Sequence, residues 1–204
     1  MSQFRQGFDC DCQCIKVGSE AFFARDVIVG RGGNREPTAN LVVGDRVFVG
    51  ERVLLNTGMP ITIGDGCFIG QFTSVMTHNI GYSYLDGYDN AFAPIEIGRD
   101  VQVGVSCFLY PGIALGGGSV ISSNSSVVSS IPDGKMAAGV PAKVLKDARR
   151  DISPMKKNRR FDELRKRLLT QLSARALHVE ELEMEGHPCL KVEYQGTYWS
   201  IIFA

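Results

Sequence analysis

Residues 97–127 have the sequence IGRDVQVGVSCFLYPGIALGGGSVISSNSSV, in which an aliphatic residue recurs at every sixth position. The recurring residues are Ile97, Val103, Leu109, Leu115, Ile121 and Val127. A period of six matches neither the period of an amphipathic helix nor the simple alternation of an isolated strand. It is typical of a solenoid in which each hexad forms one flat side and three hexads complete a coil.

The same spacing extends toward the N-terminus. Aliphatic residues at six-residue intervals are Val43, Val49, Leu55 and Ile61, followed by Ile63, Ile69 and Val75, with a rougher set at Val17, Phe23 and Val29. Each would point inward and stack on its equivalent one coil away. We therefore predict a mainly β fold for residues 1–146, a left-handed parallel β-helix built as a hexapeptide-repeat solenoid.

Two segments interrupt the repeat. Residues 31–40 are polar and contain Gly and Pro, so we predict a loop that leaves one corner. The second interruption, at 79–94, follows from the spacing of Ile63 and Ile97, which are 34 positions apart and therefore farther than one coil. Long loops on rigid scaffolds often carry function, so the 79–94 excursion is a candidate for substrate recognition.

Residues 147–204 follow a different pattern. Apolar residues at helical spacing predict an amphipathic helix over about 155–177, with Ser153-Pro154 as its start signal. The remainder is typical of two or three short strands. We predict that this C-terminal α-helix with a small β extension caps the solenoid or joins subunits.

The chain of 204 residues carries 22 basic and 22 acidic residues, so its formal net charge is zero. This balance favours no long-range attraction to nucleic acid or to a membrane surface, and we predict neither partner. The N-terminal sequence MSQFRQGFDC lacks a basic-then-apolar leader, and no apolar run approaches membrane-spanning length. We therefore expect a cytoplasmic protein whose cysteines are reduced.

Cys10, Cys12 and Cys14 alternate along the chain, so an extended segment would place all three thiols on one face. They form either a soft-metal site or a set of small side chains in a terminal strand. Single-residue gaps suit tetrahedral ligation less well than longer gaps do. We predict no metal.

Three stretches of residues 61–146 are similar to a known family. ITIGDGCFIGQFTSVMTHNIG at 61–81 is a coil that ends in a histidine, residues 93–134 contain "PG" and "IP-G" landmarks, and KMAAGVPAKVLKD at 135–147 is close to a closing "AG-PAK/R-V" signature. These stretches resemble the hexapeptide-repeat acetyltransferases. The resemblance is greatest to the branch of galactoside, maltose and xenobiotic O-acetyltransferases and polysaccharide-modifying relatives.

The resemblance implies a homotrimer that holds acetyl-coenzyme A as co-substrate in a groove between the cylinders of adjacent subunits. It also implies that the histidine at position 78 is the general base. A neutral imidazole suits this role because it can accept the proton of an attacking hydroxyl and return it to the leaving thiolate. The sequence therefore predicts acetyl transfer from acetyl-coenzyme A to a sugar, glycan or small-molecule hydroxyl, with His78 as base and no covalent intermediate.

The remaining site predictions concern the cofactor and the acceptor. By resemblance, the candidate coenzyme A contacts are Ser123, Ser129, Lys143 and Lys146. Two positions depart from the family, because Gln102 replaces a common tryptophan and Ser129 replaces a common lysine. The candidate acceptor contacts are Asn56, Tyr82, Tyr84, Asp86 and Asp89. The loop residues among them either contact the acceptor or pack the loop against a neighbouring subunit.

A second hypothesis is a solenoid that is retained as a non-catalytic binding or assembly module, since a fold does not imply a function. A zinc enzyme on the same fold would need three converging histidines. The chain has only three histidines, and two of them fall after residue 146, so we do not favour that alternative.

Overall fold

The computed structural model describes residues 1–30, 39–79, 83–88, 91–175, 178–184, 187–194 and 197–202. It divides the chain into two compact units, Met1–Arg150 and Asp151–Ala204. The fold is mainly β with one helix, as predicted. The predicted loop at 31–40 lies mostly outside the described residues, and its last residue already belongs to a strand.

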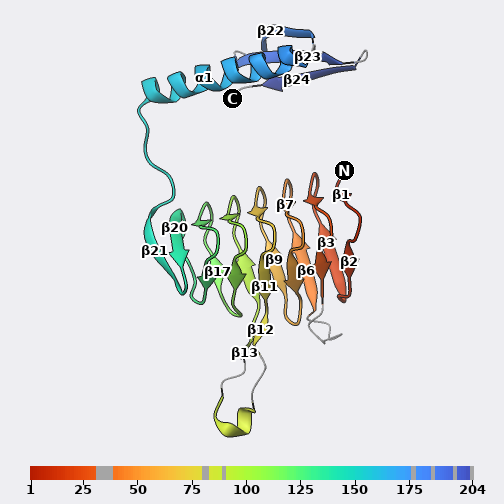
Figure 1. The fold of residues 1–204 in the computed structure, drawn as a ribbon, viewed down its shortest axis with the longest axis vertical. Helices are drawn as coiled ribbons and strands as arrows, with labels where there is room; N and C mark the ends of the chain where they lie inside the picture. Colours follow the sequence, from red (N-terminus) through yellow and green to blue (C-terminus); the bar gives the residue numbers. More distant parts are fainter. Residues whose placement is uncertain are drawn as a thin grey trace. The chain divides into compact units, whose positions relative to one another are not determined.

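Most strands of the first unit belong to three sheets that the chain visits in rotation (Figure 1). The β1 sheet contains β1 (Gln3–Phe4), β4 (Phe22–Phe23), β7 (Phe48–Val49), β10 (Phe68–Ile69), β15 (Gln102–Val103), β18 (Val120–Ile121), β20 (Lys135–Gly139) and β21 (Ala142–Asp147). The β2 sheet contains β2 (Asp9–Cys10), β5 (Ile28–Val29), β8 (Leu54–Asn56), β11 (Ser74–Met76), β16 (Phe108–Leu109) and β19 (Ser126–Val127). The β3 sheet contains β3 (Cys14–Val17), β6 (Asn40–Val43), β9 (Ile61–Ile63), β14 (Ile95–Ile97) and β17 (Ala114–Leu115).

Within these sheets the hexads pair in parallel register, so the recurring aliphatic residues stack on one another. Ile63 on β9, for example, pairs with Val43 on one side and Ile97 on the other. Ile61 and Ile63 are buried while Thr62 between them is exposed, which is the alternation expected of strands with one face inward. All the predicted inward residues from Val43 to Val127 are at most 3% exposed, so this prediction is confirmed. Burial of each such side chain stabilises the coil by roughly 1.5–3 kcal/mol.

Neighbouring coils approach most closely at the corners. A Cβ added to Gly64 would lie 2.7 Å from the backbone nitrogen of Arg99 in the next coil. No side chain fits there unless the coils separate. The glycines that follow many hexads are therefore required by the spacing between coils.

A short hairpin leaves the coils between β11 and β14 (Figure 1). Its strands are β12 (His78–Asn79) and β13 (Ala91–Phe92), which pair antiparallel, and a 3₁₀ turn, η1, covers Tyr84–Asp86. Because Ile63 pairs with Ile97, the parallel strand pairing resumes in register after the hairpin.

The second unit contains helix α1 (Pro154–Ala174) and an antiparallel sheet of β22 (His178–Met184), β23 (His187–Tyr194) and β24 (Thr197–Ile202). Ser153 caps the helix, because its Oγ accepts a hydrogen bond from the Lys156 amide at 3.4 Å and its carbonyl accepts one from the Lys157 amide at 2.9 Å. Pro154 at the first helical position has no amide hydrogen to leave unpaired. No helix in the described part of the chain is both long and apolar enough to span a membrane.

Candidate active site

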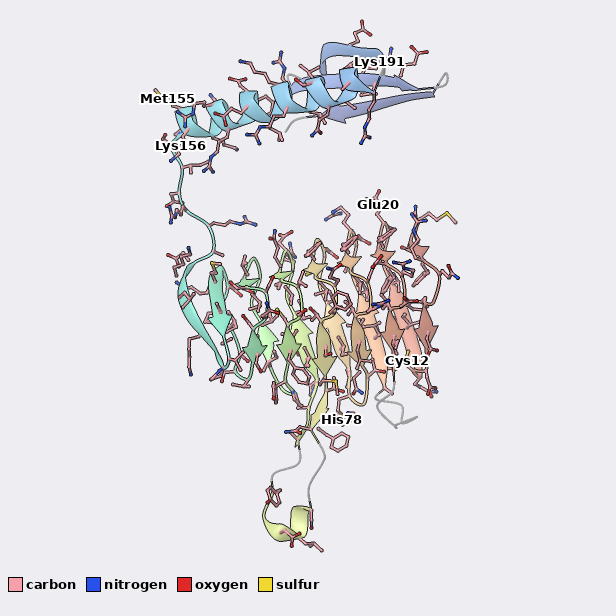
Figure 2. All side chains as sticks on the ribbon, in the orientation of Figure 1. Cys12, Glu20, His78, Met155, Lys156 and Lys191 are labelled. Carbon is pink, nitrogen blue, oxygen red and sulfur yellow. The ribbon has the colours of Figure 1, made fainter. Side chains whose placement is uncertain are left out.

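His78 lies where the hairpin leaves the β2 sheet, as Figure 2 shows. Strand β11 ends at Met76, one residue after Val75, which pairs with Leu109 of the following coil. The strand therefore ties the start of the hairpin to the β2 sheet. The position of His78 is therefore set by β11, which precedes it, and by the hairpin that it begins.

The imidazole of His78 is half-buried. Its ring stacks on Phe92 across the hairpin, with ring centroids 5.4 Å apart and an interplanar angle of 18°. Its Nδ1 is buried and has no hydrogen-bond partner among the described residues. Nε2 is consequently the ring nitrogen that remains to face a substrate.

A cavity of about 180 Å³ adjoins His78. The side chains that line it are Met76, His78, Asn79, Phe108, Tyr110 and Pro111. Ser74 pairs with Phe108, so the aromatic wall comes from the coil directly after that of β11. Met76, Phe108 and Tyr110 were not singled out from the sequence. Their signal was available, since they occupy outward positions next to the inward residues Val75 and Leu109.

A larger cavity, of about 860 Å³, lies elsewhere, along the β1 sheet. Phe22, Phe48 and Phe68 form a ladder in it, with centroids 5.4 and 5.1 Å apart and nearly parallel rings. The ring faces are turned toward one another, so the exposed surface of the ladder consists of ring edges. This ladder was not predicted from the sequence, although an aromatic residue precedes the inward residue in each of these hexads.

The rim of the larger cavity is charged. Arg5 lies over the Phe22 ring with 5.2 Å between its Cζ and the ring centroid, and Arg25 forms an ion pair with Glu51 at 3.2 Å. Of these two cavities, only the smaller one contains a histidine, the side chain whose ordinary pKa suits proton transfer at neutral pH.

The predicted cofactor residues lie toward the C-terminal end of the coils. Ser123 follows β18, and its Oγ accepts a hydrogen bond from the Val105 amide at 3.0 Å. Lys143 and Lys146 are exposed on β21, which reaches β18 through β20 in the same sheet. Ser129 is exposed and follows β19 in the β2 sheet. The two lysines thus lie in the β1 sheet and Ser123 follows one of its strands, whereas Ser129 follows a strand of the β2 sheet.

Gln102 is exposed on β15, in register between Phe68 and Val120. It therefore stands at the end of the phenylalanine ladder. The side chain replaces the tryptophan expected there and offers an amide in place of a ring.

The predicted acceptor residues separate into two groups. Asn56 is only 2% exposed at the end of β8, and its Oδ1 has no hydrogen-bond partner among the described residues. Asp86 is exposed in η1, where Tyr84 also lies, although the Tyr84 side chain is outside the described residues. Tyr82 and Asp89 lie outside the described residues as well.

At the N-terminal end of the solenoid, Cys10 Sγ and Cys12 Sγ are 3.2 Å apart. Burial, together with the hydrogen bond to Cys10, raises the pKa of Cys12 to about 12. The Cys12 thiol is therefore protonated at neutral pH. In the described part of the chain, no three His, Cys, Asp or Glu side chains gather in a geometry that could hold a metal ion.

The repeats match a family model described as the hexapeptide repeat of succinyl-transferase, over residues 40–71 and 94–129. Both matched segments coincide with regular coils, and the gap between them contains His78 and its hairpin. Over these residues the chain is similar to the hexapeptide-repeat family.

Among curated proteins, the galactoside O-acetyltransferase of Escherichia coli is 30% identical over 127 residues, which cover 58% of this chain and 63% of that protein. A putative colanic acid biosynthesis acetyltransferase of Escherichia coli is 34% identical over 107 residues, covering 52% and 58%. The chain spans about half the length of the curated relatives that it matches.

Among solved structures, a hexapeptide-repeat acetyltransferase from Vibrio cholerae, complexed with acetyl-coenzyme A, is 25% identical to this chain. The alignment covers 73% of this chain and 69% of that one, with a TM-score of 0.51.

Proposed function

We propose that this chain is a coenzyme A-dependent acyltransferase that moves an acetyl group from acetyl-coenzyme A to a hydroxyl of a sugar, glycan or small-molecule acceptor. The observation that carries the proposal is His78 at the wall of a cavity, with Nδ1 buried and Nε2 left for the substrate. The named activities of the relatives and the acetyl-coenzyme A bound in the Vibrio cholerae structure support it. We also propose that the coils wind as a left-handed β-helix.

His78 acts as the general base in this proposal. As the acceptor oxygen attacks the thioester carbonyl, Nε2 takes the hydroxyl proton and then returns it to the thiolate of coenzyme A. The substrate oxygen attacks directly, so no acyl-enzyme forms. Positioning of the two substrates in one cleft supplies much of the remaining acceleration.

The cofactor extends along the coils beyond the cavity in this proposal. Ser123 and Ser129 contact its pantetheine arm, and Lys143 and Lys146 bind its phosphates by charge. The two lysines are exposed and lie on one strand, which suits a flexible polyanion. Asp86 and the loop residues Tyr82, Tyr84 and Asp89 contact the acceptor.

We further propose that the chain assembles as a homotrimer in the cytoplasm. Several outward aromatic side chains on the coils support an interface. Phe48, Phe68 and Phe72 are 38%, 43% and 45% exposed, and large exposed apolar groups of this kind often mark contact with another chain.

The test begins with acetyl-coenzyme A binding, measured by titration calorimetry, followed by release of free coenzyme A with a panel of sugars, glycans, small alcohols and amines. The proposal predicts saturable binding and turnover with at least one hydroxyl acceptor. Mass spectrometry of the protein with acetyl-coenzyme A alone should show no acetylated species. Absence of cofactor binding would instead favour the non-catalytic module, and turnover with amines only would refute the hydroxyl acceptor.

A further inference from the structure

Two buried polar atoms lie beside Gly58, and neither has a hydrogen-bond partner among the described residues. They are Nδ1 of His78 and Oδ1 of Asn56. The position that a Cβ on Gly58 would occupy is 3.0 Å from Nδ1 and 3.7 Å from Oδ1. An unpaired buried polar atom costs about 1–3 kcal/mol, so two such atoms beside the same glycine are expected to have a role.

The neighbouring hydroxyl does not offer a donor to either atom. Thr77 Oγ1 donates its hydrogen to the carbonyl of Asn56 at 2.7 Å and accepts a hydrogen bond from the Met59 amide at 2.9 Å. These two bonds fix the backbone on both sides of Gly58. They also leave Asn56 Oδ1, an acceptor, as the natural partner for a proton on Nδ1.

A neutral imidazole carries one N–H, and the position of that hydrogen decides whether both atoms can be satisfied. With the hydrogen on Nδ1, the ring donates toward Asn56 Oδ1 and keeps the Nε2 lone pair for the substrate. With the hydrogen on Nε2, two buried acceptors would face each other and the base would be lost. Hydrogen bonds at catalytic groups are often long without substrate and shorten in the reacting complex.

We infer that Asn56 and Gly58 are positioning residues that hold the proton on Nδ1 of His78. Asn56 supplies the acceptor, and Gly58 leaves the space that lets the imidazole approach it. The inference rests on the proposed function for its consequence in catalysis. It also gives Asn56 a role through His78 instead of through direct contact with the acceptor, which agrees with the 2% exposure of this side chain.

Gly58 is replaceable without backbone strain, because it does not adopt a left-handed conformation. In Gly58→Ala the new methyl group would meet Nδ1 at 3.0 Å and Thr77 Oγ1 at 3.4 Å, so the imidazole must shift. Gly117→Ala is a matched control, since its Cβ would make only ordinary contacts, the nearest at 3.5 Å.

The decisive experiment is a long-range ¹H–¹⁵N NMR spectrum of the histidine rings above neutral pH. The chain has only three histidines, so the His78 signals are assigned by their loss in His78→Gln. The inference predicts Nδ1–H in the wild type and a shift toward Nε2–H in Asn56→Ala, with Nδ1–H restored in Asn56→Asp. Thr57→Val, which removes the adjacent buried hydroxyl, should leave the tautomer unchanged.

Steady-state kinetics test what this positioning contributes to catalysis. Asn56→Ala and Gly58→Ala should lower kcat by about tenfold or more while the KM for the acceptor changes little, because the loss is in proton transfer. A raised KM with unchanged kcat would show that Asn56 binds the acceptor directly. Nε2–H in the wild type would overturn the inference whether or not the protein transfers acetyl groups. An Nδ1–H tautomer without activity would retain the inference and reject the proposed function.

Discussion

Ile97 offers a quantitative test of how the coils pack. Its side chain is 2% exposed and lies in register between Ile63 on β9 and Leu115 on β17. Ile97→Ala would remove all of the side chain beyond Cβ from a site with aliphatic neighbours in both adjacent coils. The backbone hydrogen bonds between coils fix their spacing, so the site cannot collapse around the gap.

The expected loss is the transfer free energy of the removed groups, about 0.8 kcal/mol for each methylene, plus a cavity term. Together these lower the free energy of unfolding by about 2–5 kcal/mol. Urea denaturation followed by far-ultraviolet circular dichroism measures the loss. Glu96→Ala, which changes the exposed neighbour on the same strand, is the control and should stay within about 0.5 kcal/mol of the wild type.

The result that refutes this reasoning is equal destabilisation by the two substitutions. That outcome would mean that Ile97 does not point into a packed interior, and that the six-residue period does not mark the core. A loss for Ile97→Ala below about 0.5 kcal/mol would contradict it in the same way, because a surface substitution has effects of that size.

Three further predictions concern substitutions of one or two residues. Gly64→Ala should destabilise the protein more than Gly117→Ala does in thermal melts, because its Cβ would lie 2.7 Å from backbone in the next coil, whereas the nearest contact at Gly117 is 3.5 Å away. Replacement of both Lys143 and Lys146 by Glu should raise the KM for acetyl-coenzyme A about tenfold or more and leave the melting temperature nearly unchanged; an unaltered KM would remove these lysines from the cofactor site. Burial raises the pKa of the Cys67 thiol from 9.0 to about 11, so the folded state holds this proton more tightly than the unfolded state. Its contribution to stability should be complete below pH 9 and fall as the pH rises toward 11, and Cys67→Ala should flatten that part of the curve of unfolding free energy against pH.

The regular coils could be predicted because one local rule repeats through them. Whether an aliphatic residue at six-residue spacing points inward depends only on the few residues around it, as it does for Val103 and Leu115. The signal for the start of helix α1 is equally local, since the adjacent residues Ser153 and Pro154 together specify a cap. The predicted helix over 155–177 nevertheless extends past its observed end at Ala174, because fraying ends carry weak signals.

The site was less predictable because it depends on contacts between distant segments. His78 was found from its motif, but the stacking of Phe92 on its ring depends on how the hairpin closes. That Asn56 Oδ1 is buried without a hydrogen-bond partner depends on how the chain turns one coil earlier. The phenylalanine ladder repeats a visible pattern, yet its significance appears only when the strands are in register.

The central claim is that His78 is the base of an acetyl transfer, and kcat/KM for an accepted hydroxyl substrate tests it most directly. The wild type, His78→Ala and His178→Ala, which changes a histidine of the C-terminal unit, are compared at saturating acetyl-coenzyme A. The account predicts a loss of about 100-fold or more for His78→Ala and no comparable loss for His178→Ala. Undiminished kcat/KM in a folded His78→Ala protein would contradict it.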